Sequence, residues 1–118
     1  MTEVVRGRLA APGTAPELGE SIDVLLAEAG VVVEHIVSGR TAEPVDFLQD
    51  RVEWVAVLEG AAELDVAGEP VALEAGEWIV IPAGAPHRLL RTEPGTRWLA
   101  VHLPPGGSPL SPAAPSGG

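Results

Sequence analysis

The sequence predicts an all-β domain built as an antiparallel sandwich or barrel. Short segments rich in β-branched and apolar residues recur about every ten residues from Val31 onward, without helical segments between them. Glycine- and proline-containing turn signals separate these segments, as at Gly60, Gly68 and Gly95. The chain has 118 residues and a mass of 12.2 kDa, which is enough for one hydrophobic core. We therefore expect a single domain.

Seven strands are predicted from alternation and β-propensity. They cover residues 31–38, 52–58, 61–66, 71–73, 77–82, 87–92 and 97–103.

One short helix is predicted before the first strand. Ile22, Leu25, Leu26 and Ala29 follow helical spacing within residues 17–29, and Gly30 is a suitable stop.

The two ends of the chain differ in composition from its middle. Residues 1–16 are rich in alanine, proline and glycine and predict an irregular segment. Residues 104–118 carry no charge and almost no core-forming side chain, which predicts a disordered tail. The domain itself is expected at residues 17–103.

Composition excludes several kinds of chemistry. The chain has no cysteine, so it can form neither a disulfide nor a thiolate metal site, and all seven basic residues are arginine, which excludes a lysine Schiff base. The formal charge of −10 disfavours a nucleic acid partner. No apolar run is long enough for a membrane helix and the first residues do not resemble a secretory signal, so we expect a cytoplasmic protein that does not bind membranes.

One motif points to a family. Residues 76–87 place a glycine, five residues, a proline, one residue, a glycine, two residues and a histidine in that order, from Gly76 through Pro82 and Gly84 to His87. Gly76 turns the chain, the next residues form a strand, and the corner at Pro82 and Gly84 directs His87 across the barrel. This segment resembles the second motif of the cupins, which implies a jelly-roll β-barrel that binds small molecules and often a metal ion.

The first cupin motif is matched only in its second half. Glu53 and Gly60 stand at the spacing of its glutamate and glycine, whereas Phe47 and Gln49 occupy the positions of its two histidines. The resemblance implies that Gln49, Glu53 and His87 converge inside the barrel. They would hold a divalent ion, iron, manganese, nickel or zinc, through an amide oxygen, a carboxylate and an imidazole. The same three residues could instead form a buried polar cluster without an ion.

Two further residues are candidates for substrate binding. His102 lies on the last predicted strand and would supply a second imidazole if it faces inward. Arg91 stands four residues after His87, where cupins usually carry asparagine, and strict alternation would place it on the cavity side. There it would bind either an internal glutamate or the carboxylate of a small acidic substrate.

Two functions therefore remain open. The first is a metal-dependent cupin that uses Gln49, Glu53 and His87 and acts on a small molecule. The second is a metal-free, non-catalytic cupin that binds or senses a small ligand, which the missing histidine pair favours. In both cases we expect a homodimer, because pairing would cover exposed sheet edges.

Overall fold

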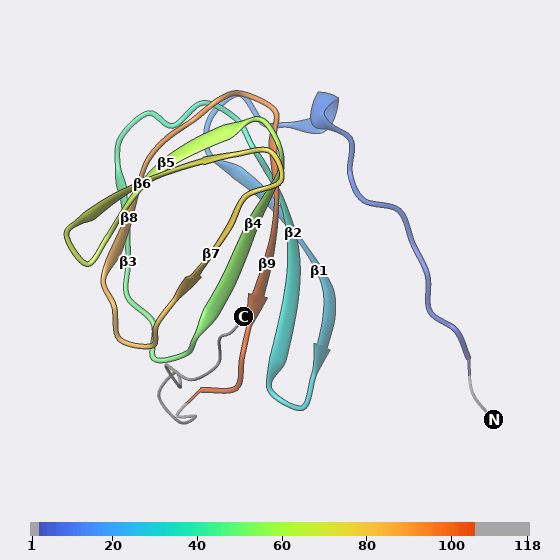
Figure 1. Ribbon diagram of the computed structural model, residues 1–118. Coiled ribbons are helices and arrows are strands. Elements are labelled where there is room, and N and C mark those ends of the chain that lie inside the picture. Colours follow the sequence, from blue (N-terminus) through green and yellow to red (C-terminus); the bar gives the residue numbers. More distant parts are fainter. Residues whose placement is uncertain (1–2, 106–118) are drawn as a thin grey trace.

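The computed structural model describes residues 3–105, and the greater part of the predicted tail lies outside them. Within these residues, nine strands form two antiparallel sheets that face each other as a jelly roll (Figure 1). The five-stranded sheet has the order β1-β2-β9-β4-β7 and the four-stranded sheet the order β3-β8-β5-β6. The predicted all-β barrel is confirmed.

From the second strand onward the strand bounds agree closely with the predicted segments, except that the short strand β3 was not predicted. The strands are β1 (Glu20–Glu28), β2 (Val31–Ser38), β3 (Val45–Phe47), β4 (Glu53–Glu59), β5 (Ala61–Val66), β6 (Glu69–Glu74), β7 (Trp78–Ile81), β8 (His87–Thr92) and β9 (Thr96–His102).

The predicted helix at residues 17–29 is wrong, because most of this segment forms β1. A bulge in the pairing with β2 inserts Leu25 between Val24 and Leu26. This extra residue breaks the two-residue alternation and leaves apolar side chains at 22, 25, 26 and 29, the spacing of a helix. The only helical turn in residues 3–105 is a 3₁₀ turn at Pro12–Thr14.

Tight turns fix the register of the hairpins. Ala29 and Gly30 join β1 to β2 with φ of 55° and 82°, and Ala67 and Gly68 join β5 to β6 with φ of 50° and 87°. Two consecutive residues with positive φ make the hairpin turn whose twist matches that of paired strands. Glycine at the second position avoids the steric cost there.

The core lies between the two sheets. Val57 and Ala100 from the five-stranded sheet are fully buried and lie in one cluster with Leu64, Leu73 and Leu89 from the other. No helix within residues 3–105 is long and apolar enough to cross a membrane.

Candidate functional site

A small cavity opens at one end of the barrel, between the two sheets. Its volume is about 120 Å³. Strands β1, β2, β4, β8 and β9 contribute titratable side chains to its lining, and Gln49 comes from the loop between β3 and β4. These side chains are Glu20, Glu34, Glu53, His87 and His102.

The sheet register explains why Glu53 and His102 meet. Glu53 is the first residue of β4 and His102 is the last residue of β9, and they are direct partners in the antiparallel pair. Side chains that are direct partners lie on the same face of a sheet. Both point into the barrel, with Glu53 Oε2 3.9 Å from His102 Nε2.

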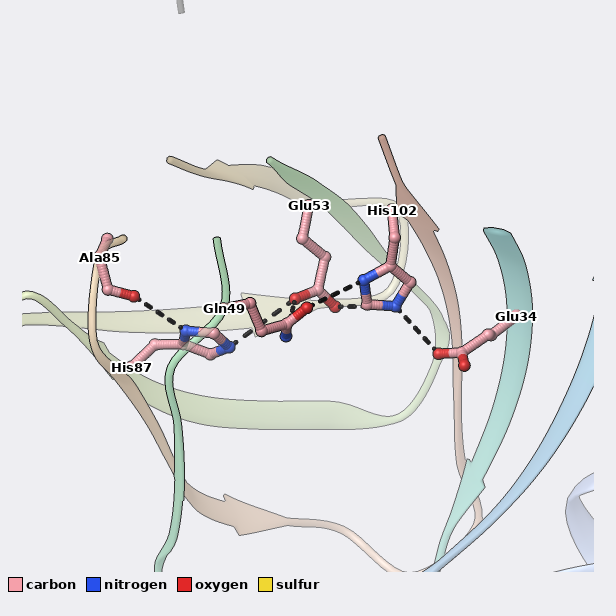
Figure 2. Close-up of polar contacts among 6 residues, drawn as sticks. All are labelled: Glu34, Gln49, Glu53, Ala85, His87 and His102. Carbon is pink, nitrogen blue, oxygen red and sulfur yellow. Dashed lines mark hydrogen bonds and ion pairs between the residues drawn. The ribbon is translucent and has the colours of Figure 1, made fainter. Parts of the chain in front are cut away.

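His87 approaches Glu53 from the opposite sheet (Figure 2). The His87 ring stacks on Phe47, with ring centroids 5.3 Å apart, and its Nδ1 donates to the carbonyl oxygen of Ala85 at 3.2 Å. With the proton on Nδ1, a neutral His87 presents the lone pair of Nε2 to the cavity. That Nε2 lies 3.7 Å from Glu53 Oε1.

Gln49 links the two sides of the site. Its amide nitrogen donates to Glu53 Oε1 at 3.1 Å, and its oxygen accepts from His102 Nδ1 at 3.2 Å. His102 Nε2 lies 3.0 Å from Glu34 Oε1. Both ring nitrogens of His102 therefore face oxygen atoms that can accept a hydrogen bond.

The electrostatics of the cavity are dominated by carboxylates. Burial raises the pKa of Glu53, against the opposing effects of His102, His87 and the hydrogen bond from Gln49. Burial also raises the pKa of Glu20, whose Oε2 accepts a hydrogen bond from Ser38 Oγ at 2.8 Å. None of the described residues that line the cavity is arginine, and the chain has no lysine, so the cavity favours a positively charged occupant.

The inward orientation predicted for Arg91 is wrong. Leu90 is an extra residue in β8 at the bulge opposite Glu63 and Leu64, so the alternation that starts at His87 reverses before Arg91. The Arg91 side chain is 73% exposed and pairs with Glu63 on the outer face of the four-stranded sheet. It therefore has no place in the cavity.

The structure brings together Gln49, Glu53, His87 and His102, and it adds Glu20 and Glu34, which the sequence analysis did not select. The available signal was the two-residue period of β2, which places Glu34 on the same face as Ile36. Within residues 3–105, no group of three or more histidine, cysteine, aspartate or glutamate side chains is arranged so that it could hold a metal ion.

Comparison with known proteins places the chain in a family. The cupin domain model matches residues 32–102, more than half of the chain. No curated protein matches it.

Solved structures agree with this match. The chain is similar to a candidate mannose-6-phosphate isomerase from Ralstonia eutropha JMP134, with 33% identity, a TM-score of 0.74, and coverage of 86% of this chain and 99% of that one. It shares its fold with KdgF from Halomonas sp., at 20% identity and a TM-score of 0.67, with coverage of 73% and 81%. The same fold occurs in the cupin domain of an XRE family transcriptional regulator from Enterobacter cloacae, at 15% identity and a TM-score of 0.62, with coverage of 74% and 98%. The chain therefore belongs to the cupin domain family.

Proposed function

We propose that the protein binds one divalent metal ion between Glu53 and His87, and that this ion takes part in binding a small molecule in the barrel. The observation that carries the proposal is the pair formed by Glu53 Oε1 and His87 Nε2, which lie 3.7 Å apart. In the neutral form of His87, its Nδ1 proton is directed to the Ala85 carbonyl, so Nε2 and the Glu53 carboxylate are two acceptors that face each other. Such a pair needs a proton or a cation between its members.

The spacing of these two atoms suits an ion. Nitrogen and oxygen ligands at about 2.0–2.2 Å from a zinc ion in tetrahedral geometry lie roughly 3.4 Å from each other. The hydrogen bond from His87 Nδ1 to a backbone carbonyl is also typical of metal-binding histidines, because it fixes both the tautomer and the ring orientation.

The remaining ligands require side-chain rotation. Gln49 points its amide nitrogen at Glu53, and a rotation of the amide would present its oxygen instead. His102 could bind the ion only if one of its ring nitrogens loses its hydrogen bond to Glu34 or to Gln49. Iron, manganese, nickel and zinc all accept such nitrogen and oxygen ligands, and a bound ion would act as a Lewis acid toward a ligand oxygen.

The ligand is expected to be small and not strongly anionic. The cavity of about 120 Å³ is well below the roughly 300–1,000 Å³ of sites for drug-sized molecules. A sugar phosphate, as in the name of the Ralstonia eutropha protein, would find no arginine among the lining residues.

A metal-free cupin that binds or senses a small ligand is the second candidate. It is favoured by the closed network that runs from Glu34 through His102 and Gln49 to Glu53, in which the side chains satisfy one another. In this case protonation of His87 would supply the positive charge beside Glu53.

Thermal denaturation with added metal separates the two functions. An ion that binds only the folded protein raises the melting temperature by mass action. We expect manganese, iron(II), nickel or zinc to produce such a rise in the unmodified protein and none in Glu53→Gln or His87→Ala.

The matched control is Glu63→Gln, because Glu63 is a carboxylate on the outer face of the barrel. This variant should keep the full rise. An unmodified protein that is purified without metal and gains no stability with any of the four ions would rule out the metal site and leave the metal-free function.

A further inference from the structure

The cavity has a second polar wall, formed by the inner faces of β1 and β2. Glu20 pairs with Ser38 and Ile22 pairs with Ile36, while Glu34 stands two residues before Ile36 on β2. Residues two apart on a strand share a face, and the two glutamates and the two isoleucines all line the cavity. This wall therefore carries a carboxylate on each side of an apolar middle.

A chain of hydrogen bonds holds Glu20 in this wall. Trp98 Nε1 donates to Ser38 Oγ at 2.8 Å, and Ser38 Oγ donates to Glu20 Oε2 at 2.8 Å. The two donor side chains are packed in the interior, since Ser38 is 0% exposed and Trp98 is 4% exposed. Within residues 3–105, Glu20 Oε1 has no hydrogen bond. One oxygen of Glu20 is thus a fixed acceptor that remains available to a ligand.

Glu34 has a free oxygen as well. Its Oε1 lies 3.0 Å from His102 Nε2, and its side chain projects from β2 toward that ring (Figure 2). Its Oε2 makes no hydrogen bond in the part of the chain that the structure describes. The wall of β1 and β2 therefore presents two carboxylate oxygens that no described residue satisfies.

The opposite side of the cavity holds a buried nitrogen without a hydrogen bond. The His87 side chain is 6% exposed, and its Nδ1 is directed to the Ala85 carbonyl. Its Nε2 has only Glu53 nearby among the described residues, at 3.7 Å, which is too long for a hydrogen bond. A buried polar atom without a partner is costly, so an occupant of the cavity would stabilise this arrangement. The proposed metal ion would satisfy His87 but not the free oxygen of Glu20.

The charge of the cavity selects the kind of group that fits beside Glu20. Burial raises the pKa of Glu20, and repulsion from Glu34 and Glu53 raises it further, so the three carboxylates are close enough to repel one another. A cation at Glu20 would offset this repulsion, whereas a carboxylate or phosphate would add to it. A primary ammonium group is a compact cation with three N–H donors and no acceptor. It therefore complements a wall that offers only acceptors.

The size and the apolar middle of the wall limit the rest of the ligand. At about 30 Å³ for each water-sized group, the cavity of about 120 Å³ has room for roughly four such groups. Ile22 and Ile36 lie between the two carboxylates and offer contacts to carbon atoms. An ammonium group with roughly two to four carbons matches this volume and this pattern.

We infer that the small molecule bound in the barrel is a short primary amine in its ammonium form. The ammonium group donates to Glu20 Oε1, the carbon chain lies against Ile22 and Ile36, and Glu34 adds negative potential along the chain. Glu53 and His87 stay available to the ion. The inference rests on the proposed binding of a small molecule in this cavity, and it does not require the metal.

Titration of the metal-free full chain with propylamine tests the inference. The probe is added near neutral pH, where a primary amine is protonated, in a buffer that contains EDTA and no other amine. The Trp98 indole N–H donates to Ser38, which donates to Glu20, so its proton and nitrogen NMR resonance reports on events at Glu20. We expect propylamine to shift this resonance with a Kd at least about tenfold lower than that of 1-propanol, which has the same carbon chain without the charge.

Glu20→Gln supplies the matched variant, because it keeps the shape of the side chain and removes its charge. The Kd for propylamine should rise about tenfold or more. Glu17→Gln, at a position outside the cavity lining, should leave the Kd unchanged. Circular dichroism confirms that both variants are folded. Equal affinity for propylamine and 1-propanol in the unmodified protein, or an unchanged affinity for propylamine in Glu20→Gln, would overturn the inference.

The result is separable from that of the metal test. Stabilisation by metal without any binding of propylamine would overturn this inference and leave the metal site standing. Binding of propylamine that depends on Glu20, in a protein that no metal stabilises, would support the inference and rule out the metal site.

Discussion

The two ends of the barrel interior are built from the same strands but from opposite kinds of side chain. Along β4 the inward residues change from Glu53 to Val55 and Val57, and along β9 they change in the reverse direction, from Trp98 to His102. Because these strands are antiparallel, the polar residues meet at one end and the apolar residues at the other.

The difference separates the part of the barrel that stabilises the fold from the part that we propose as a binding site. At the apolar end, buried side chains remove apolar surface from water and stabilise the fold. At the polar end, Glu20 and Glu53 are desolvated, which raises the pKa of each carboxyl and disfavours its charged form. We therefore expect substitutions at the two ends to act in opposite directions on stability.

The largest effect is expected at the apolar end. Leu73→Ala removes a side chain that is 4% exposed and lies in the core away from the cavity. We expect a loss of about 2–5 kcal/mol in the free energy of unfolding, measured by urea denaturation, because a cavity is left behind. The stabilisation by metal should be retained. The control Leu48→Ala, at a position that is 72% exposed, should change the free energy by less than about 0.5 kcal/mol.

Glu53→Gln should have the opposite effect on the metal-free protein. Since burial raises the pKa of Glu53, the ionised carboxylate is unfavourable in the folded state at neutral pH. We expect a higher urea midpoint without metal, together with loss of the stabilisation that metal gives. A lower midpoint would show that the attraction of Glu53 to His87 and His102 outweighs its burial.

Glu20 should give a pH dependence of stability. Burial raises its pKa in the folded state above the ordinary value of 4.5, so the folded state holds the proton more tightly than the unfolded state. The stability associated with Glu20 is therefore fully present below pH 4.5 and is lost as the pH rises through the folded pKa. In urea titrations across this range, Glu20→Gln should reduce the decline, whereas Glu17→Gln, which lies outside the cavity lining, should not.

The smallest effect is expected at Arg91. Its ion pair with Glu63 is solvent-exposed, and such pairs contribute at most about 1 kcal/mol. Arg91→Ala should therefore change neither the urea midpoint appreciably nor the response to metal. A loss of metal or ligand binding in this variant would contradict the outward orientation of Arg91.

The sequence predicted the strands better than the bulges. Alternation and turn residues are local signals, and they located every strand from Val31 onward except the three-residue strand β3. A bulge depends on the partner strand, so residues 25 and 90 could not be recognised as extra residues from their own neighbourhood. Each bulge changes the side of the sheet to which the residues after it point. The bulge at Leu25 led to the wrong helix prediction, and the bulge at Leu90 led to the wrong orientation of Arg91.

The site was predicted in part for the same reason. The motif spacing selected Glu53, His87 and Gln49, which the structure places together. Glu20 and Glu34 belong to no motif, and only the pairing of β1 and β2 beside β9 brings their carboxylates to the cavity.

The most direct test of the account is the nitrogen NMR spectrum of the histidine rings, of which the chain has three. In the metal-free protein we predict a proton on His87 Nδ1, because this nitrogen faces the carbonyl oxygen of Ala85. Addition of equimolar zinc should shift the His87 Nε2 resonance and leave His35, which faces the outer side of the sheet, unchanged. A His87 ring protonated on both nitrogens, with a spectrum unaffected by excess zinc, would contradict the metal site.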